Sequence, residues 1–392
     1  GLPETGMDFQ AVMVATCLVA AVASAMMGLL ANYPIALAPG MGENFVFVLT
    51  VVPACAALAI PNAAPWQTAL GVVFIAGVLF FLLSILGLRK AIMDAMSPSM
   101  KNAVAVGIGL FIAFVGLQNS GLIVDNPGTL VALNVDLYNP ASLVFMVTLL
   151  VTAVLFVRGF RGAIFWGIIT GLVLATLLGL VTPAVPVSSP PSVAPTLFQL
   201  DIANVFRYIA ELLPFIIIFT VMDIFDTVGT LVGVAEQADL LEDGELPRAQ
   251  KAFVADSTGT VLGSLAGTST VTSFIESTTG VESGGRSGLT ACFVALLFLL
   301  ALFFSPLVEM VTACHAVTAP ALVVVGAMMM RNVTAIEWRE YSECIPAFLT
   351  LIGIPLTYSI ADGLALGFIS YPLVKLLSGR WRQTSWLMYL LG

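Results

Sequence analysis

Charged side chains are scarce in this chain. Asp, Glu, Lys and Arg make up only 9% of the 392 residues, whereas 59% are hydrophobic, and the mean hydropathy is +1.05. Soluble domains carry about 25% charged and about 45–50% apolar residues, so this composition excludes a soluble enzyme. A helix that crosses a bilayer needs about 20 largely apolar residues. The sequence therefore predicts an all-α polytopic membrane protein.

The chain also has few histidines and cysteines, which are the commonest ligands of zinc and other transition metals. It contains a single histidine, His315, and five scattered cysteines without C-x-x-C spacing. This pattern predicts free thiols and no metal site. The sequence shows no Walker A loop and no nucleophile with a matching base. We therefore expect no enzyme activity, no cofactor and no nucleic-acid partner.

Apolar runs alternate with short polar connectors along most of the chain. About thirteen runs are long enough to enter a membrane, and a Pro/Ser-rich connector at residues 183–195 separates the two halves. If the chain starts outside, alternate crossings place every Lys and Arg except Arg207 on one side. Lys and Arg gather in cytoplasmic loops, so this is the predicted cytoplasmic side.

Each half contains one segment that cannot form a plain helix. Residues 31–47 hold two prolines and two glycines, and residues 266–280 begin with β-branched and hydroxyl residues. The prolines and glycines stop a continuous helix in the first segment, and the β-branched and hydroxyl residues favour a strand followed by a short helix in the second. We expect both interrupted segments to contain short strands. Interrupted segments at matching places in two halves indicate a transporter binding site at the bilayer midplane. The alternative is that both are simple helix kinks.

Acidic residues within the apolar segments are the first candidates for function, because a charge inside a membrane is costly. Asp223 and Asp226 are three residues apart and share a face on a helix, with Thr230 one turn later. Each acid either takes part in binding and proton uptake or braces a neighbouring interrupted helix. Glu276 is predicted in the first turn of the short helix of the second interruption, as a ligand-binding group or a helix N-terminal carboxylate.

Two polar residues hold the matching place in the first interruption, namely Glu43 and Asn44. The Asn44 amide can both donate and accept hydrogen bonds. Glu43 could face the ligand, share a proton with another acid or face an aqueous vestibule, and the sequence leaves all three open. Asp256 precedes the second interruption, where we expect a structural hydrogen bond, with a part in proton coupling as the alternative.

Four stretches together resemble the AzgA-like purine permeases of the nucleobase:cation symporter-2 (NCS2) family: NYPIALAPGMGEN, FDTVGTLVGVAE, GTSTVTSFIESTTGVESGGRSGLTA and TYSIADGLALGFISYPLVKLLSGR. The resemblance covers nearly the whole chain. It implies a transporter of fourteen membrane segments in two inverted repeats of seven. It also implies a homodimer in a bacterial plasma membrane that imports adenine, guanine or hypoxanthine together with protons or sodium.

The resemblance also implies a division into domains. A core domain is expected from residues 1–101 and 196–310, and a gate domain from residues 102–195 and 311–392, with the core moving against the gate. Set against the family, this sequence begins after the first membrane segment, so we expect that helix of the core domain to be missing from the chain.

The resemblance assigns roles to individual residues. By position, Asp226, Glu276 and Asn44 correspond to substrate-binding groups of similar proteins, and aromatic neighbours are expected to cover the flat ring. The predicted substrate-binding set is Asp226, Glu276, Asn44, Phe45, Phe274, Phe225, Thr230 and Ser277. The predicted proton-coupling set is Glu43, Asp226, Glu276, Asp223 and Asp256.

One departure from the family keeps other functions open. Similar proteins commonly have an aliphatic residue where this chain has Glu43. The added carboxylate could change the substrate to another nucleobase. A carrier of organic anions on the same fold is a second alternative, although an anion site needs a base and only Arg286 lies near the interruptions. A channel or membrane sensor is the alternative from another class.

Overall fold

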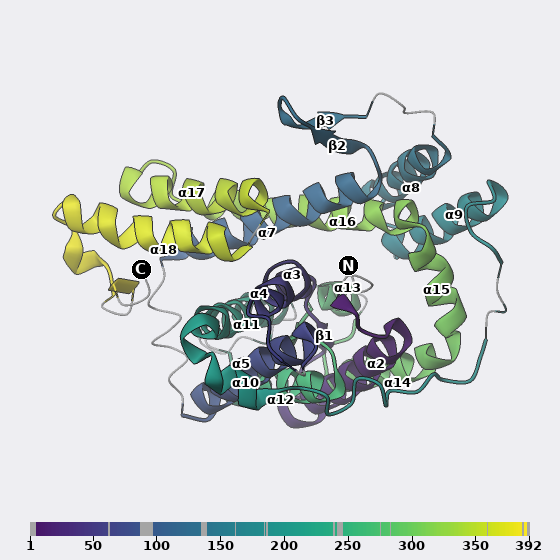
Figure 1. Ribbon diagram of the computed structural model, residues 1–392, viewed down its shortest axis with the longest axis horizontal. Coiled ribbons are helices and arrows are strands. Elements are labelled where there is room, and N and C mark those ends of the chain that lie inside the picture. Colours follow the sequence, from purple (N-terminus) through teal and green to yellow (C-terminus); the bar gives the residue numbers. More distant parts are fainter. Residues whose placement is uncertain are drawn as a thin grey trace. The chain divides into compact units, whose positions relative to one another are not determined.

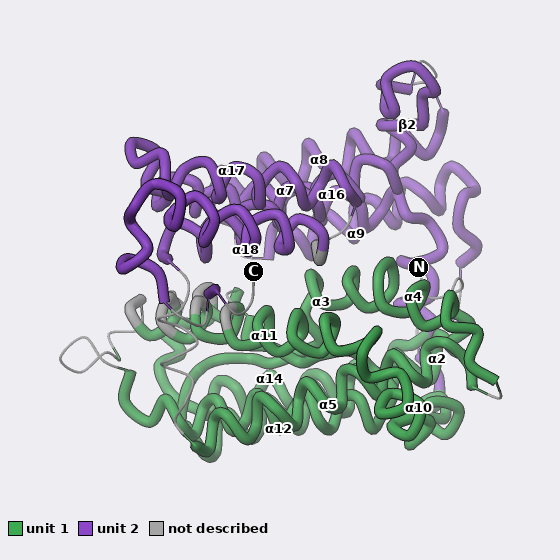
Figure 2. The backbone as a smooth tube through the Cα atoms, turned by 60° about the vertical axis from the view of Figure 1, so that its left-hand side comes forward, with its two compact units in different colours: residues 1–95, 189–305 green, residues 96–188, 306–392 purple. Residues whose placement is uncertain are grey.

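The computed structural model describes all residues except 1–4, 62, 87–96, 135–138, 161, 184, 186, 238–239, 241–245, 275, 283, 359, 386–387 and 390–392. The chain divides into two compact units (Figure 2). Unit 1 comprises residues 1–95 and 189–305, and unit 2 comprises residues 96–188 and 306–392. Each unit therefore takes elements from both halves of the sequence.

Unit 1 is built from helices and two very short strands (Figure 1). From the first half of the chain it takes α2 (Phe9–Met26), η1 (Met27–Ala31), β1 (Leu37–Pro39), α3 (Met41–Val46), η2 (Phe47–Val51), α4 (Val52–Ala57) and α5 (Pro65–Leu86). From the second half it takes α10 (Ile202–Arg207), α11 (Ile209–Gln237), α12 (Ala249–Ala266), β4 (Val271–Ser273), α13 (Ser277–Glu282), α14 (Gly288–Ala301) and η3 (Leu302–Phe304).

Unit 2 is a second helical body with one β-hairpin. Its elements from the first half are α7 (Pro98–Asn119), β2 (Ile123–Asn126), β3 (Leu130–Leu133), α8 (Pro140–Val157) and α9 (Ala163–Leu177). Those from the second half are α15 (Ser305–Ala313, whose first residue belongs to unit 1), α16 (His315–Met329), η4 (Met330–Ala335), α17 (Tyr341–Thr357), α18 (Ile360–Leu377) and η5 (Trp381–Gln383). Helix α7 packs against both α16 and α17, and α17 packs against α18 (Figures 1 and 2).

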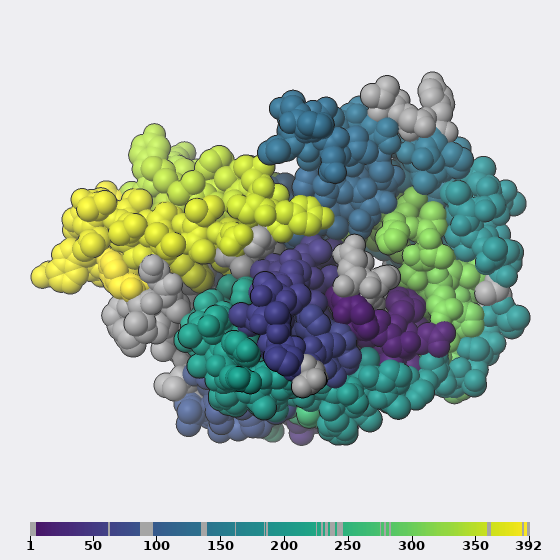
Figure 3. Space-filling view, in the orientation of Figure 1, coloured from purple at the N-terminus to yellow at the C-terminus, as the bar shows by residue number. Residues whose placement is uncertain are grey.

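Several of the long helices have apolar bodies long enough for a bilayer. Within the described residues, six helical stretches qualify by length and hydropathy: Phe9–Ala31, Pro65–Leu86, Pro98–Asn119, Pro140–Val157, Gly288–Ala313 and His315–Ala335. Large apolar side chains such as Val157 and Leu377 are exposed, and α17 and α18 cover a broad part of the surface in the space-filling view (Figure 3). These features fit an integral membrane protein.

Polar residues outside the apolar runs define where helices begin. Asp8 caps α2 by accepting a hydrogen bond from Ala11 N, and Asn139 caps α8 in the same way through Ala141 N. Ser97 caps α7, and Pro98 follows it at the first helical position, where a missing N–H has no cost. The helix starts are therefore encoded locally by the sequence.

The core of unit 1 packs the elements of the two halves together. Helices α2, α5 and α12 contribute small apolar residues and two aromatic rings, with Phe80 edge-on to Phe253 at 6.2 Å between ring centroids. Gly28 and Gly288 let η1 and α14 approach closely, because a Cβ on Gly288 would collide with the Gly28 carbonyl oxygen. This packing surrounds the two interrupted segments.

Both interrupted segments contain the short strands that the sequence predicts. Strand β1 lies in the first interruption and β4 in the second, and they pair antiparallel, as Leu37 with Ser273, Ala38 with Thr272 and Pro39 with Val271. Ser24 of α2 holds the outer edge of β1 by bonding both the N–H and the C=O of Leu37. The alternative of two simple helix kinks is therefore wrong.

The β2–β3 hairpin of unit 2 is a feature that sequence reasoning missed. Asn126 and Leu130 close a turn in which Asn126 Oδ1 accepts hydrogen bonds from Gly128 N and Thr129 N. The sequence NPGT at this point is a typical turn signal between two short apolar runs. That signal could have identified the hairpin.

Candidate functional site

The pleat of the β1–β4 ribbon gives it two faces with different surroundings. Paired residues of an antiparallel ribbon point to the same side. Ala38 and Thr272 therefore share one face, which we call the site face, and Leu37 and Ser273 share the other, which we call the core face. A hydrogen bond from Phe274 N to the Ala36 carbonyl, 3.0 Å long, extends the ribbon and places Phe274 on the site face.

Helix α11 brings two aspartates to this ribbon, and they have different environments. Asp226 is exposed and accepts a hydrogen bond of 3.0 Å from Thr272 Oγ1 on the site face. Asp223, one turn earlier, is buried and accepts a hydrogen bond of 2.9 Å from Thr260 Oγ1. Its Oδ1 atom is buried without a hydrogen-bond partner among the described residues.

Asp256 lies on α12 against the core face and is fully buried. Its Oδ2 accepts a hydrogen bond of 2.7 Å from Thr227 Oγ1, and its Oδ1 accepts one of 2.9 Å from Ser273 Oγ. The Thr227 and Thr272 hydroxyl oxygens are 3.3 Å apart. Hydroxyl groups therefore connect the buried Asp256 with the exposed Asp226.

These acids have hydroxyl groups rather than bases as partners. Among the described residues, no Lys or Arg forms an ion pair with Asp223, Asp226 or Asp256; the two ion pairs that the structure resolves there lie in unit 2. The residues that the structure describes also contain no group of three or more His, Cys, Asp and Glu side chains that could hold a metal ion. Several like charges buried without a counter-ion are costly, so a shared proton would stabilise the cluster.

Helix α3 places the two polar residues of the first interruption. Glu43 is buried, and its carboxylate folds over Gly40, where a Cβ would collide with it. Its burial argues against an aqueous vestibule and leaves the other two interpretations. Asn44 Oδ1 accepts a hydrogen bond from the Ser269 hydroxyl, so the amide nitrogen of Asn44 is the group that can donate to a ligand.

A cavity of about 260 Å³ lies on the Phe274 side of the ribbon, within unit 1. Ligand pockets span about 300–1,000 Å³, so this cavity lies just below that range and has room only for a small molecule. Phe274 and Glu276 line the cavity, whereas Asp226 lies outside its lining. The remaining lining residues are Pro34, Ala36, Ala38, Ser277, Gly280, Thr290, Val294 and Phe298.

Glu276 lies just before α13, not in its first turn as the sequence predicts. The reason is a tight turn in which Ser277 N donates to the Phe274 carbonyl at 3.1 Å, so the helix begins only at Ser277. Ser277 Oγ also accepts a hydrogen bond of 3.0 Å from Ala36 N. Ser277 therefore joins the two interruptions as well as lining the cavity.

Three further predicted residues are less informative. Thr230 is buried on α11, and Phe45 on α3 is half-buried. The side chain of Phe225 lies outside the described residues. The structure therefore brings Asp226, Asp223, Asp256 and the Phe274–Glu276 pair to the ribbon, and it leaves the roles of Thr230 and Phe45 as predictions.

Sequence reasoning missed the threonines that hold the acids. Thr227 directly follows Asp226, and Thr260 follows Asp256 by one helical turn. Thr272 lies in the run already recognised as a strand. A search for hydroxyl residues next to each membrane-embedded acid would have found the first two of these.

Each unit combines elements of both halves, and the interrupted segments of the two halves pair within unit 1, an arrangement that fits the 7+7 inverted-repeat fold. The transmembrane domain of the cyanobacterial bicarbonate transporter BicA is similar, with a TM-score of 0.61 over 91% of this chain and 92% of that chain. The two sequences are only 18% identical, so this likeness shows the fold alone.

The sequence comparisons give the family. The model of the Permease family matches residues 3–366, and the chain belongs to this family. A permease of Methanocaldococcus jannaschii is 49% identical over 100% of this chain and 87% of its own length. The guanine/hypoxanthine permease PbuG of Bacillus subtilis is 44% identical over 97% of this chain and 85% of its own length. The resemblance to NCS2 purine permeases is confirmed.

Proposed function

We propose that this protein imports purine nucleobases, namely adenine, guanine or hypoxanthine, across the plasma membrane by proton symport. The proposal is supported by the family and by one structural observation. The ribbon formed by the two interruptions carries Phe274, with Glu276 just beyond it, on one side of unit 1, and Asp226 bonds to the same face.

The chemistry of these side chains suits a purine. A purine offers ring N–H donors, which carboxylates accept, and ring nitrogens or an exocyclic oxygen, which an amide can satisfy. Glu276 and Asp226 supply carboxylates, Asn44 supplies an amide nitrogen, and Phe274 supplies an aromatic surface for the flat ring. A carrier for organic anions would need bases at the same place, and the acids disfavour it.

Proton coupling is supported by the acids near the ribbon. Asp223, Asp226 and Asp256 have hydroxyl partners, and Glu43 is buried close to them. Taking up a proton with the substrate would neutralise part of this charge. We assign unit 1 as the core domain that carries the substrate and unit 2 as the gate domain, and we expect a homodimer, which light scattering of the purified protein would test.

Replacement of Glu276 tests the substrate assignment. Glu276→Gln keeps the size of the side chain but removes the charged acceptor for a purine N–H, so purine uptake should fall at least about tenfold, as expected for a lost hydrogen bond to a charged group. The measurement is uptake of radiolabelled hypoxanthine and adenine by cells that express equal amounts of each variant.

A matched control is available on α11, where Glu211 is exposed and remote from the ribbon in sequence. Glu211→Gln should leave uptake unchanged. Unchanged uptake by Glu276→Gln would overturn the assignment of this residue. Accumulation of the purine against its gradient, abolished by an uncoupler, distinguishes a proton symporter from a channel or a sensor. Uptake that depends on external sodium would show that sodium, not the proton, is the coupling ion.

A further inference from the structure

Two threonine hydroxyls span the distance between the exposed acid of the candidate site and a buried acid behind it. We propose that Asp256 is a buried store for the coupling proton, and that Thr227 and Thr272 pass this proton between Asp256 and Asp226. The inference rests on the proposed function, because it describes how the same site would couple to protons.

Three oxygen–oxygen contacts form the chain. Asp226 Oδ2 contacts Thr272 Oγ1 at 3.0 Å, Thr272 Oγ1 contacts Thr227 Oγ1 at 3.3 Å, and Thr227 Oγ1 contacts Asp256 Oδ2 at 2.7 Å. Both threonines are buried, as is Asp256, whereas Asp226 is exposed. The chain thus leads from an accessible carboxylate to one that water does not reach.

Counting hydrogens shows what completes this chain. Each threonine has one hydroxyl hydrogen, so two ionised aspartates leave only two hydrogens for three contacts. Both hydroxyls then donate outward to the acids, and the central contact has no hydrogen. One additional proton on either aspartate supplies the third hydrogen, and every contact becomes a hydrogen bond. The geometry therefore matches one proton shared by Asp226 and Asp256.

The two states of the chain have the shared proton on Asp226 or on Asp256. The transfer from the first state to the second balances without any other reactant. The proton on Asp226 moves to Thr272 Oγ1, the hydroxyl hydrogen of Thr272 moves to Thr227 Oγ1, and the hydroxyl hydrogen of Thr227 moves to Asp256 Oδ2. Three O–H bonds break and three form. Both threonines end as neutral hydroxyls, Asp226 ends ionised and Asp256 ends protonated.

The neighbouring acid shows why Asp256, rather than Asp223, is suited to this task. Thr260 Oγ1 bonds to Asp223 Oδ2 at 2.9 Å and to the Val271 carbonyl oxygen at 2.9 Å. A proton on Asp223 completes this second chain as well, but the chain ends at a backbone carbonyl, which cannot take up a proton to continue it. Only the Asp226–Asp256 chain has a carboxylate at both ends.

The relay connects substrate binding with the proton. When Asp256 holds the proton, Asp226 is ionised and can accept an N–H of the substrate. The charged groups that act on Asp256 from the packed elements are also carboxylates, namely Glu43 of α3 with Asp223 and Asp226 of α11. Their like charge favours retention of the shared proton within the cluster.

Substitution of Thr227 is the direct test. Thr227 contacts both Asp256 and Thr272 in the proposed relay, and it is not in the proposed substrate-binding set. Thr227→Val keeps the shape and removes the hydroxyl, whereas Thr227→Ser keeps a hydroxyl. The control is Thr220→Val on the same helix, since Thr220 is buried and bonds only to backbone carbonyls, those of Ile216 and Ala76. All variants are purified, reconstituted in liposomes and compared with the wild type.

Two measurements are made on each variant. The first is hypoxanthine accumulation driven by a pH gradient, together with hypoxanthine exchange without a gradient. The second is an infrared difference spectrum, in which the absorption band of protonated carboxyl groups is compared in acidic and alkaline buffer. This measurement requires no substrate. We expect Thr227→Val to lose about tenfold in proton-driven accumulation, as for a lost hydrogen bond to a charged group, while exchange persists. Its carboxyl band should shift, and Thr227→Ser and Thr220→Val should match the wild type.

The two readouts separate the possible failures. Wild-type accumulation and an unshifted carboxyl band in Thr227→Val would overturn the relay. If Thr227→Val fails to fold, Asp256→Asn provides the same test. It removes the buried proton acceptor, so the change in the carboxyl band that the wild type shows between acidic and alkaline buffer should be lost. A shifted band in Thr227→Val, in a protein that transports no purine, would support the proton relay and overturn the proposed substrate.

Discussion

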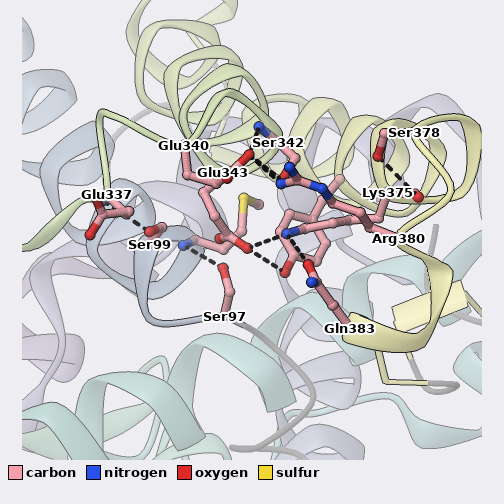
Figure 4. A network of polar contacts seen from close by, with 12 residues as sticks. Ser97, Ser99, Glu337, Glu340, Ser342, Glu343, Lys375, Ser378, Arg380 and Gln383 are labelled. Atoms are coloured by element: carbon pink, nitrogen blue, oxygen red, sulfur yellow. Dashed lines mark hydrogen bonds and ion pairs between the residues drawn. The ribbon is translucent and has the colours of Figure 1, made fainter.

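Units 1 and 2 both bury ionisable groups, and they do so in different ways. In unit 2, Lys375 is 3% exposed and lies 2.8 Å from Glu343 Oε1, which also accepts a hydrogen bond of 2.9 Å from the Tyr371 hydroxyl (Figure 4). In unit 1, the side chains that form hydrogen bonds with Asp223, Asp226 and Asp256 are hydroxyls and not bases among the described residues.

This difference teaches what each unit is built to do. A lysine is a permanent counter-ion, fixed by its helix, so the network of unit 2 ties the start of α17 to the end of α18 (Figure 4). A proton is a counter-ion that can leave. The charge balance at the buried Lys375–Glu343 pair of unit 2 is therefore static, whereas that of the unit 1 acids can change during a transport cycle.

The largest effect that would test this comparison is expected for Lys375→Met. Removal of the lysine leaves Glu343 buried without its counter-ion, and breaking a buried pair in this way costs about 3–5 kcal/mol. We expect a clear fall in the melting temperature of the detergent-purified protein. The double variant Lys375→Met with Glu343→Met should recover most of the loss, because it leaves no unpaired charge.

A single variant as stable as the wild type would show that the pair is not a fixed counter-ion arrangement. Wild-type melting of the double variant together with a destabilised single variant would show that the intact pair adds no net stability and that the loss comes from the unpaired charge. Circular dichroism at the helix band follows unfolding in each case.

A smaller effect is expected when an acid of unit 1 is neutralised. In Asp223→Asn, the amide nitrogen can donate to Thr260 Oγ1 as a protonated carboxyl would, so the hydrogen bond between the two positions is retained. The free energy of unfolding should change by no more than about 1 kcal/mol. A loss as large as that of Lys375→Met would mean that unit 1 needs the charge of Asp223 for folding, and the comparison between the units would fail.

Much of the fold follows from local features of the sequence. The prolines and glycines of residues 34–42 predict the first interruption, because they stop a continuous helix. The run GTSTVTS at 267–273 predicts the strand of the second, because β-branched and hydroxyl residues favour extended backbone. The three-residue spacing of Asp223 and Asp226 places both on one side of α11. None of these predictions requires knowledge of distant contacts.

The partners of the acids could not be predicted in the same way. Thr227 and Asp256 are on different helices, and their 2.7 Å contact depends on how α11 and α12 pack. The same holds for Thr272 with Asp226, which depends on the register of a ribbon whose strands are more than two hundred residues apart. The start of α13 after Glu276 depends on a tight turn that helix propensity does not reveal.

The smallest expected effect concerns Glu340 and Arg380, the exposed ion pair of unit 2. Unlike the buried Lys375–Glu343 pair, this exposed pair should respond to pH. A hydrogen bond from the Arg380 guanidinium, with two from Ser342, lowers the pKa of Glu340 from its ordinary value of 4.5 to about 2. A carboxylate whose pKa is lower in the folded state contributes its full stabilisation above the unfolded pKa and loses it as the pH falls through the folded pKa. Between about pH 4.5 and pH 2, the melting temperature of the wild type should therefore fall more steeply than that of Glu340→Gln. The difference should be small, because exposed ion pairs contribute little.

Glu337→Gln, in the same loop and exposed, is the control and should keep the steep wild-type slope. Parallel curves for the wild type and Glu340→Gln would show that the start of α17 is held without this ion pair, which would leave Lys375 as the charge that fixes the network.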